Sequence, residues 1–317
     1  MPSGRLAVVA FGGNALIRGG EEGTQTEQIE NSDRLARRLV AFVEKGFGLL
    51  VVHGNGPQVG NILIQVEEAV TKVPPVSLDV CVAQSEGGIG YLLARSLENR
   101  LRRRRLQREV VCLVTPVLVD RRDPGFRKPT KPIGPFFEKE KAARLMEELG
   151  WPMVEDAGRG WRKVVASPKP LAIRGVEVAA ALVNRGHIVI AAGGGGVPVV
   201  ITEEGEIRGV EAVIDKDYSA SMLAAALQAD LFVILTGVER VARDYGKPTE
   251  EPLSLIRVDA ARKLLAEGQF PPGSMGPKID AAIRYIAAGG HEVLITRAES
   301  LGEALEGRTG TRIREKE

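Results

Sequence analysis

Cysteine, histidine and aromatic residues are all scarce in this 317-residue chain. Its two cysteines, Cys81 and Cys112, are too few and too far apart for a disulfide framework or a cysteine-based zinc site. The three histidines, His53, His187 and His291, are equally scattered. Aromatic residues make up only 4% of the chain, which argues against the stacking surfaces that bind single-stranded nucleic acid. Zinc proteins, disulfide-rich proteins and base-stacking proteins are therefore not expected.

The chain also lacks a charge excess and long hydrophobic runs. It has 43 Lys+Arg against 41 Asp+Glu, a net charge of +2, whereas dedicated nucleic-acid binders usually carry a strong basic excess. No apolar run approaches the roughly 20 residues of a membrane-spanning helix, and no signal-peptide pattern precedes the strand-like run at 5–11. We expect a soluble, cytoplasmic protein that binds small molecules, with no nucleic acid and no membrane among its partners.

What the sequence has in quantity is an alternation of strand-like and helix-like segments. Six short β-branched runs end in glycine-rich or polar turns, at 6–11, 49–53, 110–115, 187–192, 231–236 and 292–296. Such apolar runs are typical of parallel strands covered on both faces. The alternation predicts an α/β fold, a three-layer α/β/α sandwich with a mainly parallel central sheet. Ligands of such sheets bind beyond the carboxyl ends of the strands.

One stretch interrupts this alternation. From about residue 120 to 170 the chain is rich in proline, glycine and basic residues, as in DPGFRKPTKPIGPFF and GWRKVVASPKP. An insertion of this size is a small protruding subdomain, a mobile lid over a site, or an excursion without function. The overall length exceeds one ordinary core and suggests two lobes or one large sheet with an insertion.

Glycine-rich loops follow the first two predicted strands. Gly12 and Gly13 would let backbone N–H groups approach an anion, and Asn14 adds a side-chain donor, although a plain tight turn is the alternative. In HGNGPQVG, Pro57 fits the first position of a helix whose free N–H groups point at the preceding loop. His53 in the same motif is interpreted as structural, because a lone histidine at a strand end seldom acts as an acid or base.

A third loop contains four consecutive glycines, at 193–196. Four glycines cost more conformational entropy than a turn requires. We therefore favour close approach of this backbone to a phosphate or carboxylate. The chain has no GxxxxGK[ST] motif and no GxGxxG after the first strand, so the common nucleotide-loop patterns do not apply.

Two lysines are predicted at helix entrances. In IDKDY, Asp217 is the expected N-cap, and Asp215 would orient Lys216 toward a transferring phosphoryl group; a capping cluster with a surface lysine is the alternative. In GSMGPK, Lys278 falls in the first helical turn, where it opposes the helix dipole by a few tenths of a kcal/mol. An anion bound there would offset that cost.

The run Arg102–Arg105 closes a long helical pattern, and we interpret it as a solvated helix end. Glycine-rich loops and lysines, without a catalytic histidine or cysteine, are typical of phosphoryl transfer, which depends on positioning and charge neutralisation.

The motifs resemble those of the carbamate kinases, within the amino-acid kinase superfamily. The resemblance extends from GGNAL at 12–16 to Gly310-Thr311 and includes HGNGPQVG at 53–60, QSEGGIGY at 84–91, PTKPIGPF at 129–136, AAGGGGVPV at 191–199, AVIDKDYSASMLA at 212–224, TGVERV at 236–241 and GSMGPKIDAAIRY at 273–285. PTKPIGPF is typical of the protruding subdomain that separates these enzymes from their relatives. The resemblance implies reversible transfer of the ATP γ-phosphoryl group to carbamate, giving carbamoyl phosphate and ADP, with Mg²⁺.

The resemblance also implies residue roles. Positions facing the phosphoryl group or the acceptor would be Gly12, Gly13, Asn14, Gly54, Asn55, Gly56, Gly194 and Gly195. Catalytic side chains, besides Asn14, would be Lys131 from the lid, Lys216, Lys278, and Asp215 fixing the ammonium groups of Lys216 and Lys278. Nucleotide-pocket positions would be Thr236, Gly237, Val238, Tyr245, Met275 and Gly276. The acceptor lobe would comprise residues 1–182, with the lid inserted, and the nucleotide-binding lobe residues 183–317.

No carboxylate pair for Mg²⁺ stands out, so the ion would be held by nucleotide phosphates and water, and no metal-ligating residue is predicted. The family is usually dimeric, which implies a homodimer. Two alternatives stay open: a related acyl-phosphate kinase acting on an amino acid, and a non-catalytic sensor that binds nucleotide.

Overall fold

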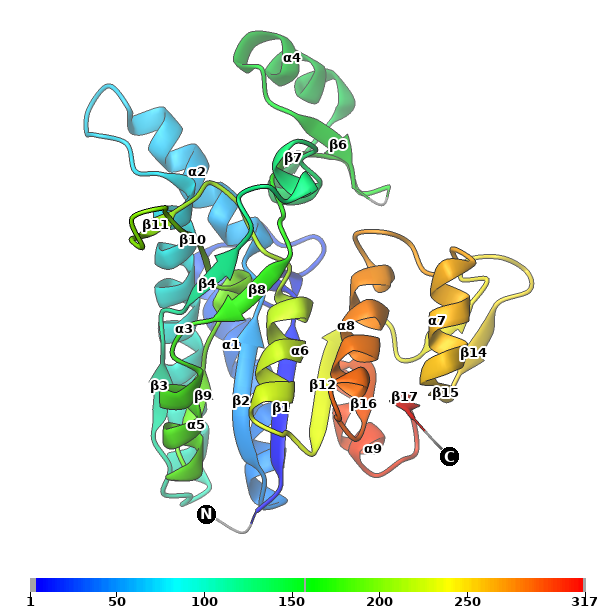
Figure 1. The fold of residues 1–317 in the computed structure, drawn as a ribbon. Helices are drawn as coiled ribbons and strands as arrows, with labels where there is room; N and C mark the ends of the chain where they lie inside the picture. Colours follow the sequence, from blue (N-terminus) through cyan, green and yellow to red (C-terminus); the bar gives the residue numbers. More distant parts are fainter. Residues whose placement is uncertain (1–3, 157, 316–317) are drawn as a thin grey trace.

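The computed structural model describes residues 4–156 and 158–315. Its centre is an eight-stranded sheet of order β15-β17-β16-β12-β1-β2-β9-β3 (Figure 1). The strands are β1 (Leu6–Phe11), β2 (Gly48–His53), β3 (Val110–Cys112), β9 (Ile188–Ile190), β12 (Leu231–Thr236), β15 (Leu255–Arg257), β16 (Val293–Arg297) and β17 (Thr311–Arg314). All neighbours pair in parallel except β16 and β17. The predicted mainly parallel sheet is confirmed.

Helices cover both faces of this sheet, so the predicted three layers are confirmed. Alternate side chains of a strand point to opposite faces. Ala7 and Val9 of β1 pack with α1 (Gln25–Glu44), α3 (Leu78–Arg103) and α9 (Leu301–Leu305). Val8 and Ala10 pack with α5 (Val176–Asn184), α6 (Lys216–Ala226), α7 (Val258–Ala266) and α8 (Met275–Ala287). Among the described residues, every helix is too short or too polar to cross a lipid bilayer.

Helix α1 illustrates how the sequence sets these layers. Thr24 caps its first turn and Glu27 returns the bond to the Thr24 backbone, which satisfies N–H groups that the helix leaves unpaired. Leu35, Leu39 and Val43 recur at helical spacing and are buried against the sheet.

The predicted insertion at about 120–170 forms a small subdomain that leaves the body from a second sheet. The chain enters a second sheet, ordered β11-β10-β4-β8, whose strands are β4 (Pro116–Val119), β8 (Pro170–Ile173), β10 (Val197–Ile201) and β11 (Ile207–Gly209). Between β4 and β8 it leaves the body as β5 (Lys131–Phe137), α4 (Lys139–Leu149), β6 (Met153–Glu155) and β7 (Trp161–Val165). These elements, which we call the lid, form an antiparallel three-stranded sheet with α4 and rise above the body in Figure 1.

The base of the lid packs against α2 (Gly56–Ala69). A Cβ on Gly60 would lie 2.0 Å from the backbone nitrogen of Gly134 in β5, so only glycine permits this approach. Val59 and Ile133 are fully buried in the cluster beside it. The lid therefore rests directly on the helix that follows the HGNGPQVG loop.

The division into lobes of residues 1–182 and 183–317 stays a prediction. Strand β9, from the second segment, lies between β2 and β3 from the first. The predicted strands at 110–115 and 187–192 are shorter in the structure, because the chain turns at Thr115 into β4 and at Gly193 into a 3₁₀ turn, η3 (Gly193–Gly195).

Candidate active site

The loops after β1 and β2 pack against each other at the carboxyl edge of the sheet. A Cβ on Gly54 would lie 2.6 Å from the Gly13 nitrogen, and one on Gly13 would lie 2.9 Å from Cδ of Pro57. Gly13 begins the 3₁₀ turn η1 (Gly13–Ala15), and Gly56 begins α2, so Pro57 is the second helical residue, one position later than predicted. Both motifs therefore lie at strand ends, as predicted, and the structure shows in addition that they contact each other. The prediction for the Asn14 side chain lies outside the described residues.

The four glycines at 193–196 pack closely against other parts of the protein, and their predicted approach to a bound anion stays a prediction. Gly194, Gly195 and Gly196 have φ values of +67°, +97° and +88°, which side chains rarely adopt. A Cβ would lie 2.1 Å from the Asn55 amide nitrogen at Gly194 and 2.5 Å from the Ile214 carbonyl oxygen at Gly195. Protein atoms therefore occupy the positions that a side chain would take at Gly194 and Gly195.

Hydrogen bonds inside the protein also use most N–H groups of this loop. The Gly193 N–H donates to Oε1 of Glu86 at 2.6 Å. The N–H groups of Gly195 and Gly196 donate to the carbonyls of Ala192 and Gly193. The glycine run thus packs three loops together, and the substrate contacts of Gly194 and Gly195 stay a prediction.

Three lysines and two aspartates converge beside these loops, and we call them the lysine cluster. Lys131, the first residue of β5, donates to Oδ2 of Asp215 at 2.6 Å. Lys216 Nζ lies 3.1 Å from Asp217, and Lys278 Nζ lies 3.2 Å from the same carboxylate. The cluster draws together the lid, the start of α6 and the first turn of α8. It brings together the four predicted catalytic residues other than Asn14.

The roles expected for the two aspartates are wrong in detail. Asp215, not Asp217, is the N-cap of α6, and its carboxylate accepts from the Asp217 N–H at 3.0 Å. Asp217, not Asp215, contacts both Lys216 and Lys278. The reason is that Asp215 has extended backbone geometry before the helix and faces the lid, whereas Asp217 lies within the first helical turn and is 1% exposed.

Charge balance in the lysine cluster favours an anionic ligand. Burial alone would raise the pKa of Asp215, but the nearby ammonium groups hold that pKa well below its usual range. Burial would lower the pKa of Lys216, but Asp217 and Asp215 outweigh burial and raise it. Burial, aided by Lys216, lowers the pKa of Lys278. Three ammonium groups against two carboxylates leave one net positive charge when all are ionised.

The residues predicted to bind the nucleotide lie at the end of β12, at the start of α8 and in one turn between them in the chain. Thr236 ends β12, and Gly237 and Val238 come next. Met275 and Gly276 open α8. Tyr245 lies in the turn between β13 (Val241–Arg243) and β14 (Glu251–Leu253) and is 59% exposed. Their part in nucleotide binding stays a prediction.

Sequence analysis missed the role of Glu86. This side chain is fully buried on α3 and accepts from the N–H groups of Thr115, at 3.1 Å, and Gly193. Burial raises its pKa to about 8. The sequence did contain a signal: Glu86 is a carboxylate on the same face of the helix as the apolar residues Val82 and Ile89, which are buried. Glu86 therefore holds the first residue of the glycine run, Gly193, and Thr115 in place through two hydrogen bonds.

His53 is buried next to the same loop, where a Cβ on Gly193 would lie 2.3 Å from its Nε2. Burial lowers its pKa to about 4, so the ring is neutral near pH 7. This environment fits the structural interpretation of His53.

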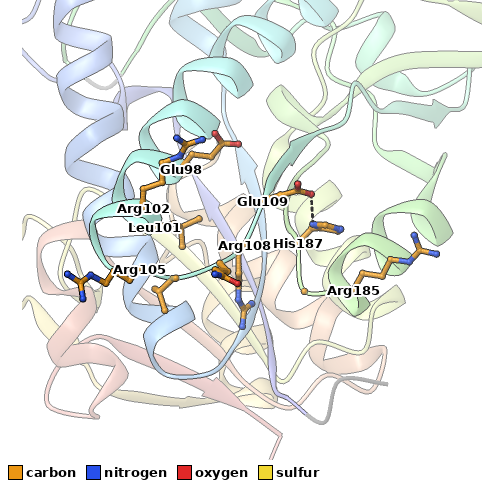
Figure 2. Close-up of a pocket in the computed structure, with 11 residues that line it drawn as sticks. Glu98, Leu101, Arg102, Arg105, Arg108, Glu109, Arg185 and His187 are labelled. Carbon is orange, nitrogen blue, oxygen red and sulfur yellow. Dashed lines mark ion pairs between the residues drawn. The ribbon is translucent and has the colours of Figure 1, made fainter.

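The arginine run lies at the other end of the sheet. Arg102–Arg105 are exposed, as predicted for a helix end. Arg102 and Arg105, with segment 106–109 and the turn at 185–187, border a pocket of about 780 Å³. Figure 2 shows His187 and Glu109 side by side there, with Nδ1 of His187 3.3 Å from Oε2 of Glu109. The residues that line this pocket come before β3 and β9 in the chain, at the amino ends of these strands. None of them belongs to the lysine cluster.

Metal ligands were not predicted in the sequence. Within the part of the chain that the structure describes, no group of three or more His, Cys, Asp or Glu side chains is arranged to hold a metal ion.

Comparisons with known proteins agree with the fold and the motifs. A model of the amino acid kinase family matches residues 5–297. The chain is 46% identical to carbamate kinase from Pyrococcus furiosus, over 98% of this chain and 99% of that protein. It is also 46% identical to carbamate kinase from Thermococcus kodakarensis, with the same coverage.

Solved structures give the same result. Carbamate kinase from Giardia lamblia bound to citric acid superimposes with a TM-score of 0.94 at 38% identity, covering 99% of both chains. The same enzyme bound to AMP-PNP gives a TM-score of 0.89 at 39% identity, again over 99% of both chains. The resemblance seen in the sequence is confirmed: the chain belongs to the amino acid kinase family and, within it, to the carbamate kinases.

Proposed function

We propose that the chain transfers the γ-phosphoryl group of ATP to carbamate, giving carbamoyl phosphate and ADP, and that the reaction is reversible. The observation that carries the proposal is the lysine cluster, with one net positive charge, beside the packed loops after β1 and β2. A relative 39% identical to this chain has been solved with AMP-PNP, a nucleotide analogue, which supports ATP and ADP as substrates here.

In the proposed step a carbamate oxygen attacks the γ-phosphorus while the bond from that phosphorus to the β–γ bridging oxygen breaks. ADP leaves with the bridging oxygen and its electron pair. Carbamate already carries a negative oxygen, so no general base is needed. Lys216 and Lys278 would neutralise charge on the transferring group and the bridging oxygen, and Lys131 would reach in from the lid.

The two aspartates would act as positioning residues in this step. Asp217 holds Lys216 and Lys278 near one point, and Asp215 holds Lys131. Preformed ion pairs of this kind fix donors before the substrate arrives, so little reorganisation is needed during transfer.

The remaining assignments are proposed on the same basis. The loop residues Gly12, Gly13 and Asn14 would face the transferring phosphoryl group, and Gly54, Asn55 and Gly56 would hold carbamate. The nucleotide would bind at the end of β12 and the start of α8. Residues 1–182 would form the acceptor lobe, with the lid, and residues 183–317 the nucleotide lobe.

The carboxylates of the lysine cluster fit a Mg²⁺ ion that enters the site together with the nucleotide. Both carboxylates of the cluster are engaged by lysines, so phosphate oxygens and water would supply most of the ligands, as the ion's strong hydration allows. Bound there, the ion would neutralise phosphate charge.

A homodimer in the cytoplasm is proposed as well. Tyr91 of α3 is 61% exposed and Val114, just after the edge strand β3, is 54% exposed, which makes this edge a candidate contact. Light scattering on the purified chain would measure the mass in solution.

The direct test is ATP formation from ADP and carbamoyl phosphate with Mg²⁺, with acetyl phosphate as a control donor. Turnover on carbamoyl phosphate alone supports the proposal. Turnover on neither donor, with nucleotide still bound, would point to another acceptor or to a sensor.

Lys216→Met tests the assigned chemistry. We expect turnover to fall by about 10²–10³-fold, the usual loss when one preorganised donor is removed. Lys263→Met is the matched control, because the Lys263 side chain is 79% exposed on α7. Near-normal turnover of the Lys216 variant would contradict the assignment.

A further inference from the structure

The lid carries a buried guanidinium group with one unused donor. Arg162 lies on β7 and is 5% exposed. Its Nε donates to the Gly134 carbonyl at 3.0 Å, and its Nη1 donates to Oδ2 of Asp156 at 3.0 Å. Its Nη2 is buried without a hydrogen-bond partner among the described residues. A buried donor without a partner is costly, so the position of this group calls for an acceptor.

The unused donor faces the loop where carbamate is proposed to bind. A Cβ on Gly56 would lie 3.6 Å from Nη2 and 3.5 Å from the Pro132 carbonyl. Gly56 ends the loop after β2 and begins the 14-residue helix α2. Free N–H groups at the start of that helix also favour a negative ligand. Nη2 therefore lies beside the start of α2, so both supply hydrogen-bond donors in the same part of the site.

The local charge favours an anion as well. Asp156 is shared by Arg162 and Arg159, whose Nη2 lies 3.1 Å from it. Two guanidinium groups against one carboxylate leave one positive charge on this part of the lid. A guanidinium group keeps its charge at any physiological pH, and its planar fork suits a carboxylate-like partner.

We propose that Arg162 is an acceptor-binding residue, whose Nη2 donates a hydrogen bond to an oxygen of carbamate, or of the carbamoyl group in the reverse reaction. The inference rests on the proposed function. Asp156 and Gly134 fix the plane of the guanidinium, so Nη2 is held in place next to Gly56 at the end of the loop after β2.

The experiment compares Arg162→Gln with Arg159→Gln in the ATP-forming assay. Both arginines pair with Asp156 and lie over the Phe136 ring, but the Arg159 side chain is 48% exposed. We expect Arg162→Gln to raise KM for carbamoyl phosphate about tenfold or more, the cost of a lost charged hydrogen bond. KM for ADP should stay unchanged, and Arg159→Gln should behave as wild type.

Arg162→Lys separates geometry from charge. It keeps the charge but lacks the fork, so its KM for carbamoyl phosphate should also rise, and it replaces the glutamine variant if that one does not fold. An unchanged KM for carbamoyl phosphate in a folded variant would overturn the inference. Equal increases in both KM values would overturn it too, since they would indicate a general disturbance of the lid. Wild-type protein without turnover would instead overturn the proposed function.

Discussion

Replacing Asp217 by asparagine tests whether one carboxylate holds two lysines in the cluster. Asp217 is 1% exposed and lies 3.1 Å from Lys216 Nζ and 3.2 Å from Lys278 Nζ. Removing one partner of a buried ion pair costs about 3–5 kcal/mol. Asp215 stays in the cluster and limits the repulsion, so we expect the lower end, about 3 kcal/mol. At about 2–4 °C per kcal/mol, the melting temperature should fall by about 6–12 °C.

The pH dependence of this loss follows from Lys278. Its pKa lies below the ordinary value of 10.5 because of burial and Lys216, while Asp217 opposes that shift. Without Asp217 the pKa of Lys278 in the folded protein should fall further below that of the unfolded chain than it does in wild type. The unfolded chain then binds more protons over that window, so the stability of the variant should rise with pH and approach that of wild type.

The assay is urea unfolding at several pH values, with turnover measured on the same samples. Phosphate should restore part of the lost stability, because it binds the excess positive charge. Asp259→Asn is the control, since Asp259 is an exposed residue of α7 paired with Arg257 at the end of β15; it should change neither stability nor turnover measurably. If Asp217→Asn has wild-type stability and turnover, the reasoning is refuted.

Two further predictions concern the lid base and the buried glutamate. Gly60→Ala should displace the lid, because its Cβ would lie 2.0 Å from the Gly134 nitrogen; we expect about 1–3 kcal/mol of destabilisation and lower turnover, whereas Gly302→Ala, with open space around it, should be tolerated. Glu86 keeps its proton in the folded state up to about pH 8, against an ordinary pKa of 4.5, so wild-type stability should fall across that interval relative to Glu86→Gln. If the stabilities of wild type and Glu86→Gln change with pH in the same way, the expectation for Glu86 is contradicted.

The fold and the position of the site could be predicted because their signals are local. Runs such as 6–11 and 231–236 are apolar at consecutive positions, which identifies strands buried on both faces, and the motifs follow their ends. A parallel sheet gathers those ends at one edge. Sequence reasoning therefore predicted that the motifs lie at the carboxyl ends of the strands, whereas the contact between the loops at Gly13 and Gly54 follows from the pairing of β1 with β2.

Side-chain partners could not be predicted, because they depend on contacts between distant segments. Asp215 and Asp217 are both acidic residues at one helix start, and only the position of the lid shows that the first of them contacts Lys131. The glycine run at 193–196 gave a correct signal of close approach, but its partners, Asn55 and Ile214, come from elsewhere in the chain.

Strand order has a consequence for folding. The central strand β1 pairs with β2, which follows it closely, and with β12, which begins at Leu231. One edge of β1 therefore stays unpaired until more than two hundred further residues have been synthesised. Contacts of such long sequence separation slow folding and expose strand edges to aggregation. During synthesis, chaperones that shield apolar strands should matter most in the interval before β12 emerges from the ribosome.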